Sequence, residues 1–232
     1  MYDIGIVGLG FLGGSLAKSL RKSNKINSIL AYDKNINSLK QAKDEGVITD
    51  YCVNIDNKFE VCDIVFICTP VKSILAIATE LEKVTNNNCI ITDTGSTKKT
   101  IIQSVKELKH EFIGGHPMVG SERSGYQTSK ENLFENSYYI ITKNKNNKPN
   151  SIKVLEEIIE EIRAIPIIID ECEHDFITAT ISHVPHIIAS SLTTMVQQLD
   201  NEDEIMKTLA ARRIQGHYKN CFIRSNYVGK YL

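Results

Sequence analysis

Short apolar runs alternate with longer segments of helical periodicity along most of the chain. The runs are nearly continuous in apolar residues and are bounded by polar turns, as expected for parallel strands covered on both faces. We predict strands over Ile4–Val7, Ser28–Tyr32, Ile64–Cys68, Cys89–Thr92, Phe112–Gly114, Tyr138–Thr142 and Ile165–Ile169. We predict helices over Leu12–Ser23, Ile36–Glu45, Val71–Val84, Lys98–Leu108 and Ser151–Arg163.

The order of these elements predicts the fold class. Strands that alternate with helices form βαβ units, whose right-handed crossovers build a parallel, doubly wound sheet. The pattern from Cys172 to about Leu199 is helical. We therefore expect an α/β protein with two parts: a doubly wound domain over residues 1–170, and the start of an all-helical domain over residues 171–232.

A glycine-rich turn, Gly8-Leu9-Gly10-Phe11-Leu12-Gly13, follows the first predicted strand and opens the first predicted helix. In a G-x-G-x-x-G turn the glycines allow a tight bend, a close approach of pyrophosphate to the backbone, and close helix–strand packing. The helix N-terminus then offers N–H groups to the phosphates. Asp33 follows Gly13 by 20 residues, at the end of the second predicted strand. A carboxylate there accepts hydrogen bonds from the ribose of NAD and repels the 2′-phosphate of NADP.

The strand, turn, helix and acid together predict a Rossmann domain that binds NAD. The residues that we expect to contact the cofactor are Gly8, Gly10, Phe11, Leu12, Gly13, Asp33, Thr69 and Pro70. Lys34, which follows Asp33 directly, would soften the preference for NAD over NADP. The alternative is a glycine turn without a ligand, beside an aspartate that only caps a helix.

The composition is that of an ordinary globular protein and narrows the classes of partner. The 232 residues suffice for one large or two small domains. A net charge of -1 argues against a nucleic-acid binder. The N-terminus lacks a signal-peptide pattern and no apolar run is long enough for a membrane span, so we expect a cytoplasmic protein without a membrane partner. The six cysteines form no C-x-x-C pair, and we expect buried free thiols.

The segment GGHPMVGSERSG, residues 114–125, holds candidate catalytic residues. It follows a predicted strand, and in an open α/β sheet ligands bind beyond the carboxyl ends of the strands. His116 in such a place can act as a general base near neutral pH. A histidine in a loop is also often structural, and this segment alone leaves both interpretations open.

This segment resembles the GGHPMxGSExSG signature of the prephenate dehydrogenase family. The chain is similar to that family at three further places: the turn DTGSTK over Asp93–Lys98, the pair His174-Asp175, and the segment ISHVPH over residues 181–186. The N-terminal VGLGFLGGSLA matches as well, and the resemblance extends from Ile4 to about Ala211.

The resemblance implies a reaction, the NAD-dependent oxidative decarboxylation of prephenate to 4-hydroxyphenylpyruvate in tyrosine biosynthesis. Hydride would leave the ring carbon that bears the hydroxyl group, and loss of CO2 would make the ring aromatic. His116 matches the catalytic histidine that polarises this hydroxyl, and Ser96 matches a serine that orients it. His186, His183 and Ser121 are expected to bind the substrate, and the family is expected to form homodimers.

The histidines at 174, 183 and 186 allow two other interpretations. Each is also compatible with a buried, hydrogen-bonded imidazole in a helical core. Three histidines could also bind zinc, but spacings of 9 and 3 residues fit no usual zinc pattern. We therefore expect no metal.

The resemblance stops after Ala211. The family continues with G-G-F-K/R-D-x-T-R-I-A, whose arginine binds a carboxylate of prephenate, whereas this chain ends in RRIQGHYKNCFIRSNYVGKYL. The tail can be back-translated with AT-rich codons. A reading frame shifted to start at the second base of the Arg213 codon can then encode GFKDITRIASSDPIMWENI, which resembles the missing family motif. We therefore hypothesise a one-base frameshift near Ala211–Arg213, natural or a sequencing error. A chain truncated in this way would bind NAD but turn over prephenate poorly or not at all, and its homodimer becomes doubtful.

Three alternatives to this function stay open to different degrees. An arogenate dehydrogenase differs only in a substrate with an amine in place of the keto group. A β-hydroxyacid dehydrogenase requires a catalytic lysine on the interdomain helix, and the chain has no lysine between Lys153 and Lys207, which argues against that class. The third alternative is an inactive, NAD-binding remnant.

Overall fold

The structure is a computed structural model that describes residues 1–120, 123–200, 203, 205–206 and 208–209. The chain divides into two units, Met1–Asp175 and Phe176–Leu232. The domain boundary predicted after residue 170 coincides with the end of the last strand, and it stays a prediction. Ser121, Cys221 and the tail that motivated the frameshift hypothesis lie outside the described residues.

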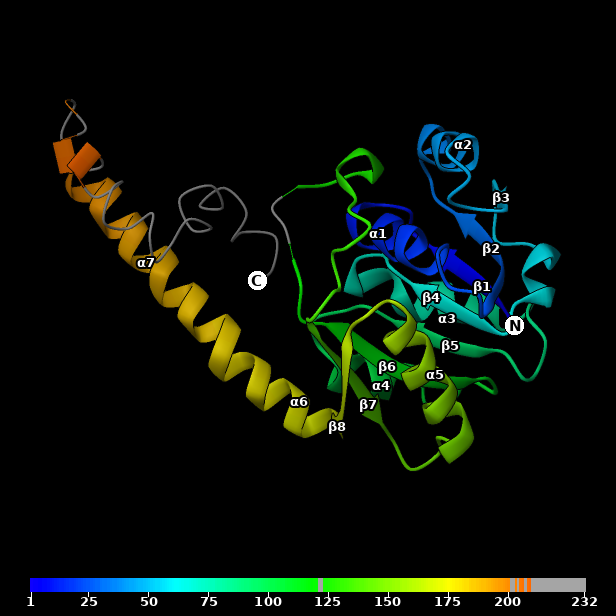
Figure 1. Ribbon diagram of the computed structural model, residues 1–232. Helices are drawn as coiled ribbons and strands as arrows, with labels where there is room; N and C mark the ends of the chain where they lie inside the picture. The colour runs from blue at the N-terminus through cyan, green and yellow to red at the C-terminus, as the bar shows by residue number, and fades with distance from the viewer. Residues whose placement is uncertain (121–122, 201–202, 204, 207, 210–232) are drawn as a thin grey trace. The chain divides into compact units, whose positions relative to one another are not determined.

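A single eight-stranded sheet forms the centre of the first unit, in the order β3-β2-β1-β4-β5-β6-β7-β8 (Figure 1). The strands are β1 (Tyr2–Val7), β2 (Ile26–Tyr32), β3 (Asp50–Cys52), β4 (Ile64–Ile67), β5 (Ile90–Asp93), β6 (Glu111–Pro117), β7 (Tyr138–Lys143) and β8 (Ile165–Asp170). The first six are parallel and confirm the predicted doubly wound, Rossmann-type arrangement. β7 runs antiparallel to β6, and β8 runs parallel to β7.

Helices connect and follow these strands. They are α1 (Phe11–Leu20), α2 (Ile36–Asp44), α3 (Ile74–Leu81), α4 (Lys99–Val105), α5 (Pro149–Glu161), α6 (Glu171–Thr178) and α7 (Val184–Leu199). Shorter 3-10 segments are η1 (Asn57–Val61), η2 (Val71–Ser73) and η3 (Tyr126–Thr128), and a π-helical segment, η4 (Ala179–His183), separates α6 from α7.

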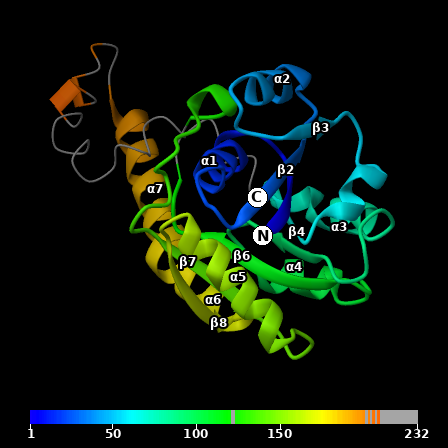
Figure 2. The same cartoon turned by 45° about the vertical axis from the view of Figure 1, so that its right-hand side comes forward.

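The sheet has a separate apolar core on each face, because successive side chains of a strand point to opposite sides. In β1, Ile4 and Ile6 belong to one core and Val7 to the other. The first core is closed by α1, α2 and α5, and the second by α3, α4 and η1 (Figures 1 and 2). All four residues of β4 are buried, as the continuous apolar run predicted.

Four details differ from the sequence-based predictions. β3 was missed, because three residues carry too little pattern to be recognised. The helix predicted over Val71–Val84 begins as the 3-10 segment η2 directly after Pro70, and the helical stretch from Cys172 contains the π segment η4. The prediction that all cysteines are buried is wrong for Cys172, which is exposed because it lies on the solvent side of α6; Cys68 is half-buried.

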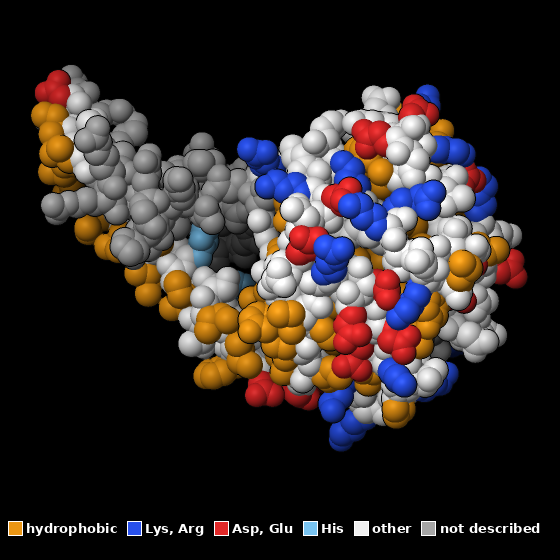
Figure 3. All heavy atoms as spheres, in the orientation of Figure 1, with side chains coloured by type: hydrophobic (Ala, Val, Ile, Leu, Met, Phe, Trp, Pro, Cys, Tyr) orange, Lys and Arg blue, Asp and Glu red, His pale blue; other side chains and the backbone are white. Residues whose placement is uncertain are grey.

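The second unit exposes a row of large apolar side chains. They recur every three or four residues, and therefore share one face of a helix: Ile181, Val184, Ile188, Leu192, Met195 and Leu199. Figure 3 shows apolar side chains following this helical segment. We call these six residues the apolar stripe. No helix within the described residues is both long enough and apolar enough to cross a membrane.

Candidate functional site

The glycine-rich turn between β1 and α1 has the geometry that binds a dinucleotide. Gly8 has a φ of 98°, and a Cβ on it would lie 2.8 Å from the carbonyl oxygen of Cys68. A Cβ on Gly13 would lie 1.9 Å from the carbonyl oxygen of Gly8. Both positions therefore need glycine for the turn itself, with or without a ligand.

Gly10 differs from these two glycines. Within the described residues, a Cβ built on it meets no atom at less than 4 Å, and its φ of -83° is one that any residue adopts. The fold therefore does not require glycine here. Gly10 is the N-cap of α1 and has no side chain, so the first N–H groups of α1 receive no side-chain hydrogen bond from the N-cap.

Asp33 lies directly after β2 and holds the glycine turn. Its Oδ2 accepts a hydrogen bond of 2.6 Å from the backbone N–H of Leu9, and its Oδ1 accepts one of 2.7 Å from the N–H of Asn35. Each carboxylate oxygen can accept more than one hydrogen bond, so these contacts leave capacity for ribose hydroxyls.

The remaining predicted cofactor residues surround the same turn. Phe11 and Leu12 begin α1, buried and half-buried respectively. Thr69 and Pro70 follow β4, and Cγ2 of Thr69 lies 2.8 Å from the Cβ position of Gly8. The structure thus brings the predicted set together at the carboxyl ends of three adjacent strands, β2, β1 and β4.

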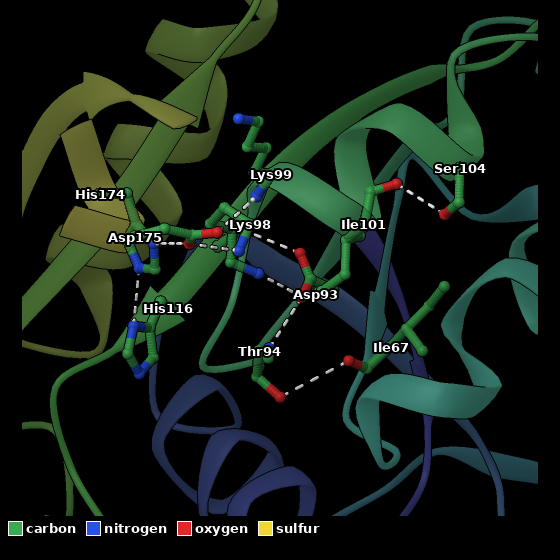
Figure 4. Close-up of polar contacts among 12 residues, drawn as sticks. Ile67, Asp93, Thr94, Lys98, Lys99, Ile101, Ser104, His116, His174 and Asp175 are labelled. Carbon is green, nitrogen blue, oxygen red and sulfur yellow. Dashed lines mark hydrogen bonds and ion pairs between the residues drawn. The ribbon is translucent and has the colours of Figure 1, made fainter. Parts of the chain in front are cut away.

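His116 lies near the carboxyl end of β6 and is 9% exposed. Its Nδ1 is 2.9 Å from Nε2 of His174, and the two rings meet edge to face (Figure 4). Nδ1 of His174 is 2.7 Å from Oδ1 of Asp175. We call these three residues the triad; it lies entirely within the first unit.

Asp175 is itself fixed by the start of α4. Its Oδ1 accepts a hydrogen bond of 2.7 Å from the backbone N–H of Lys98, and its Oδ2 accepts one of 3.1 Å from the N–H of Lys99. It thus caps α4 from a distant part of the sequence, where the helix dipole also favours a negative charge. Burial raises the pKa of Asp175, but the hydrogen bonds from His174 and from these two backbone groups outweigh it, and the net shift is downward.

A buried ion pair lies beside the triad. Lys98 and Asp93 are both fully buried, and Nζ of Lys98 donates to Oδ2 of Asp93. The same carboxylate accepts hydrogen bonds from the backbone N–H groups of Gly95, at 2.8 Å, and Gly115, at 3.1 Å. Burial lowers the pKa of Lys98, and the charge of Asp93 opposes this only in part. Asp93 therefore ties the end of β5 to the backbone immediately before His116.

Burial also lowers the pKa of His174 from its ordinary value of 6.5, and the hydrogen bond to Asp175 opposes this only in part. The positive charge of Lys98 acts in the same direction as burial. A neutral imidazole is therefore favoured at position 174 near neutral pH. Its two ring nitrogens then have different roles, one as donor and one as acceptor.

The remaining predicted catalytic and substrate-binding residues lie outside the triad. Ser96 is exposed in the turn between β5 and α4. His183 ends the π segment η4 and His186 lies in α7; both are half-buried and belong to the second unit. Ser121 lies outside the described residues. The roles of these four residues stay predictions.

Sequence reasoning gave no role to Asp93, Lys98, His174 or Asp175. Asp93 and Lys98 were noted only as parts of the DTGSTK turn, and His174 and Asp175 only as an isolated pair. Asp175 lies 76 positions after Lys99, whose backbone N–H it accepts. Nothing in a single sequence joins such distant segments. A usable signal was the concentration of ionisable residues in otherwise small-residue turns at strand ends.

Comparison with family models identifies both parts of the chain. The model "Prephenate dehydrogenase, nucleotide-binding domain" matches residues 16–168, and the model "Prephenate dehydrogenase, dimerization domain" matches residues 170–219. The second match extends past Ala211, where the resemblance noted in the sequence ended.

Curated and solved relatives agree with these models. The chain is 32% identical over 210 residues to a prephenate dehydrogenase of Bacillus subtilis and 34% identical over 217 residues to one of Lactococcus lactis. The alignments cover 89% and 91% of this chain, but only 57% and 58% of those proteins. The prephenate dehydrogenase of Aquifex aeolicus, solved with hydroxyphenyl propionate and NAD+, superposes with a TM-score of 0.82 at 27% identity, covering 99% of this chain and 87% of that one.

The lowered pKa of His174 predicts a pH-dependent stability. Between the folded pKa and the ordinary value of about 6.5, the unfolded chain binds more protons than the folded chain. The free energy of unfolding should therefore decrease as the pH falls from about 6.5 through this window. The neighbouring charged or titratable groups are Asp175, Lys98, Asp93 and His116.

Denaturant unfolding followed by circular dichroism between neutral and mildly acidic pH measures this effect. The variant His174→Gln keeps a polar side chain but does not titrate, so its stability should fall less steeply over the same window. An equal slope in both proteins would show that His174 does not carry the effect.

Proposed function

Because the chain belongs to the prephenate dehydrogenase family, we propose that it catalyses the NAD-dependent oxidative decarboxylation of prephenate to 4-hydroxyphenylpyruvate. One observation carries the proposal: a dinucleotide-type glycine turn and a histidine oriented by a buried partner lie at the carboxyl ends of parallel strands of one sheet. The turn follows β1 and His116 lies near the carboxyl end of β6, and the carboxyl ends of parallel strands share an edge.

The residues around the turn fit NAD. The open space above Gly10 and the N-terminus of α1 suit a pyrophosphate, and Asp33 suits the adenosine ribose. Thr69 and Pro70, next to Gly8, would line the same cofactor site. NAD supplies the hydride acceptor when bound; the protein has to hold the substrate hydroxyl and accept its proton.

His116 is the proposed proton acceptor. Its Nδ1 is engaged by His174, so that Nε2 is the ring nitrogen assigned to the substrate hydroxyl. Ser96 is proposed to orient the same hydroxyl from the turn after β5. His183, His186 and Ser121 are proposed to bind other parts of the substrate, as the family resemblance implies.

Two related substrates are to be distinguished. One curated relative, 27% identical over 195 residues, is a cyclohexadienyl dehydrogenase of Zymomonas mobilis. Arogenate, the alternative left open by the sequence, stays the alternative substrate, and an NAD-binding protein without turnover stays the alternative function. The cytoplasmic location expected from the sequence stays a prediction.

The decisive measurement is NADH formation by the purified chain with NAD+ and prephenate, and in parallel with arogenate. Turnover of prephenate supports the proposal, and turnover of arogenate alone would replace the substrate. His116→Gln should lower kcat by about 10²–10⁴, the usual contribution of a general base, while NAD+ still binds. Binding of NAD+ without turnover of either compound would overturn the proposed activity.

Gly10→Ala tests the cofactor site without changing the fold. The added methyl group meets no atom of the described part of the chain within 4 Å, so thermal stability should stay close to that of the wild type. The same methyl group would project toward the pyrophosphate, and we expect the Kd for NAD+ to rise by about tenfold or more, equivalent to about 1.4 kcal/mol. Titration calorimetry measures it.

Gly13→Ala provides the contrasting variant, because its Cβ would collide with the backbone of Gly8 and should lower thermal stability as well. Unchanged NAD+ affinity in a folded Gly10→Ala protein would contradict the proposed position of the pyrophosphate.

We also propose that the chain forms a homodimer through the apolar stripe. Six large apolar side chains in a helical row, each exposed, match a helix face that becomes buried on association. The match of this part to a dimerization domain supports the same assignment. The partner would be a second copy of this chain.

Ile188→Glu should shift the chain from dimer to monomer, because a carboxylate in the middle of the stripe cannot be buried without a partner. Sedimentation velocity at several concentrations measures the change. Gln198→Glu adds the same charge at an exposed position outside the stripe and should leave the dimer intact. A wild-type chain that is monomeric at all concentrations would refute the proposed dimer.

A further inference from the structure

We propose that Asp175, acting through His174, fixes the proton of His116 on Nδ1, so that Nε2 presents a lone pair to the substrate hydroxyl. The inference rests on the proposed function for its catalytic meaning, but the proton arrangement itself follows from the contacts of the triad. His116 remains the catalytic residue, and His174 and Asp175 are positioning residues.

The first step concerns the contact between Asp175 and His174. An ionised carboxylate has acceptors only, so the 2.7 Å contact from Nδ1 of His174 to Oδ1 of Asp175 requires a proton on Nδ1. Both carboxylate oxygens also accept backbone N–H groups at the start of α4, and these contacts favour the ionised form of Asp175.

The second step concerns the contact between the two histidines. With its proton on Nδ1, a neutral His174 has a lone pair on Nε2. The 2.9 Å contact to Nδ1 of His116 is then a hydrogen bond only if His116 donates. A neutral His116 with a proton on Nδ1 has its lone pair on Nε2.

The opposite arrangement requires a second proton on His174. A doubly protonated His174 would donate from Nε2 and push the proton of a neutral His116 to its own Nε2, where it could not accept a substrate proton. Complete burial of His174 and the positive charge of Lys98 disfavour this form. Lys98 is in turn paired with Asp93, so a buried ion pair lies beside the triad.

The geometry also explains why this arrangement is rigid. Asp175 cannot turn away from His174 without losing hydrogen bonds to Lys98 and Lys99. His174 is fully buried and has both ring nitrogens engaged. The orientation of His116 is therefore set before substrate binds, which is the usual condition for efficient general-base catalysis.

Ring nitrogen NMR tests the proton arrangement directly and needs no substrate. In the wild-type chain labelled with ¹⁵N-histidine at neutral pH, His116 should show a protonated Nδ1 and an unprotonated Nε2. The signals are assigned by their loss in His116→Gln. A proton on Nε2 of His116 in the wild type would overturn the inference, whatever the enzyme assay shows.

Two substitutions at position 174 separate positioning from packing. His174→Phe removes the acceptor for His116, while Asp175 still accepts the backbone N–H groups at the start of α4. The His116 proton should then move largely to Nε2. We expect kcat to fall about 10- to 100-fold, less than for loss of His116 itself. In His174→Gln, Asp175 accepts only, so it holds the amide NH2 group and turns the amide oxygen toward His116. This variant should keep the proton on Nδ1 and stay within about tenfold of the wild-type kcat.

Affinity for NAD+ should be unchanged in both variants. Equal kcat in the two variants, with the proton on Nδ1 in only one of them, would refute the catalytic role of the proton arrangement. If the wild type shows the expected tautomer but turns over neither prephenate nor arogenate, the proposed function fails while the proton arrangement stands. If His174→Phe does not fold, the wild-type spectrum and His174→Gln still decide the question.

Discussion

The arrangement of the site depends on the interactions of one buried carboxylate, that of Asp93. It accepts hydrogen bonds from Gly95 and Gly115 and an ion pair from Lys98, and none of these groups has access to water. Desolvation of such a pair costs several kcal/mol per ion unless further hydrogen bonds compensate it. The two backbone donors supply that compensation. Gly115 connects Asp93, at the end of β5, to the strand that carries His116, and the Lys98 ion pair connects it to the start of α4.

The constraint extends from this pair to the triad. Lys98 is held by Asp93 through its side chain and by Asp175 through its backbone N–H. The short turn that ends at Lys98 therefore connects the Asp93–Lys98 ion pair to the hydrogen bonds that orient His174 and His116. Glycine at 114 and 115 is part of the same constraint, because a Cβ at either position would meet Thr142 or the backbone of Asp93 at less than 2.5 Å.

The sequence predicted those parts of the molecule whose signal is local. Strands such as β4 are continuous apolar runs, and Gly8 and Gly13 meet steric needs of the turn that only glycine satisfies. The doubly wound arrangement and the cofactor turn follow from these elements and from the handedness of their connections. The triad was not predicted, because His116 and His174 are 58 residues apart and meet only through tertiary packing. β3 and the π segment η4 were missed since neither leaves a distinct periodicity.

The placement of Asp175 has a consequence for how the polypeptide can be divided. Every residue proposed to bind the dinucleotide precedes β5, so a fragment that stops with the last strand retains all of them. Such a fragment would nevertheless lack the carboxylate and the imidazole that orient His116 and cap α4. Cofactor recognition and proton transfer thus have different minimal lengths of chain. A gene fusion or excised domain built from this fold would have to extend through Asp175 in α6 to preserve proton transfer.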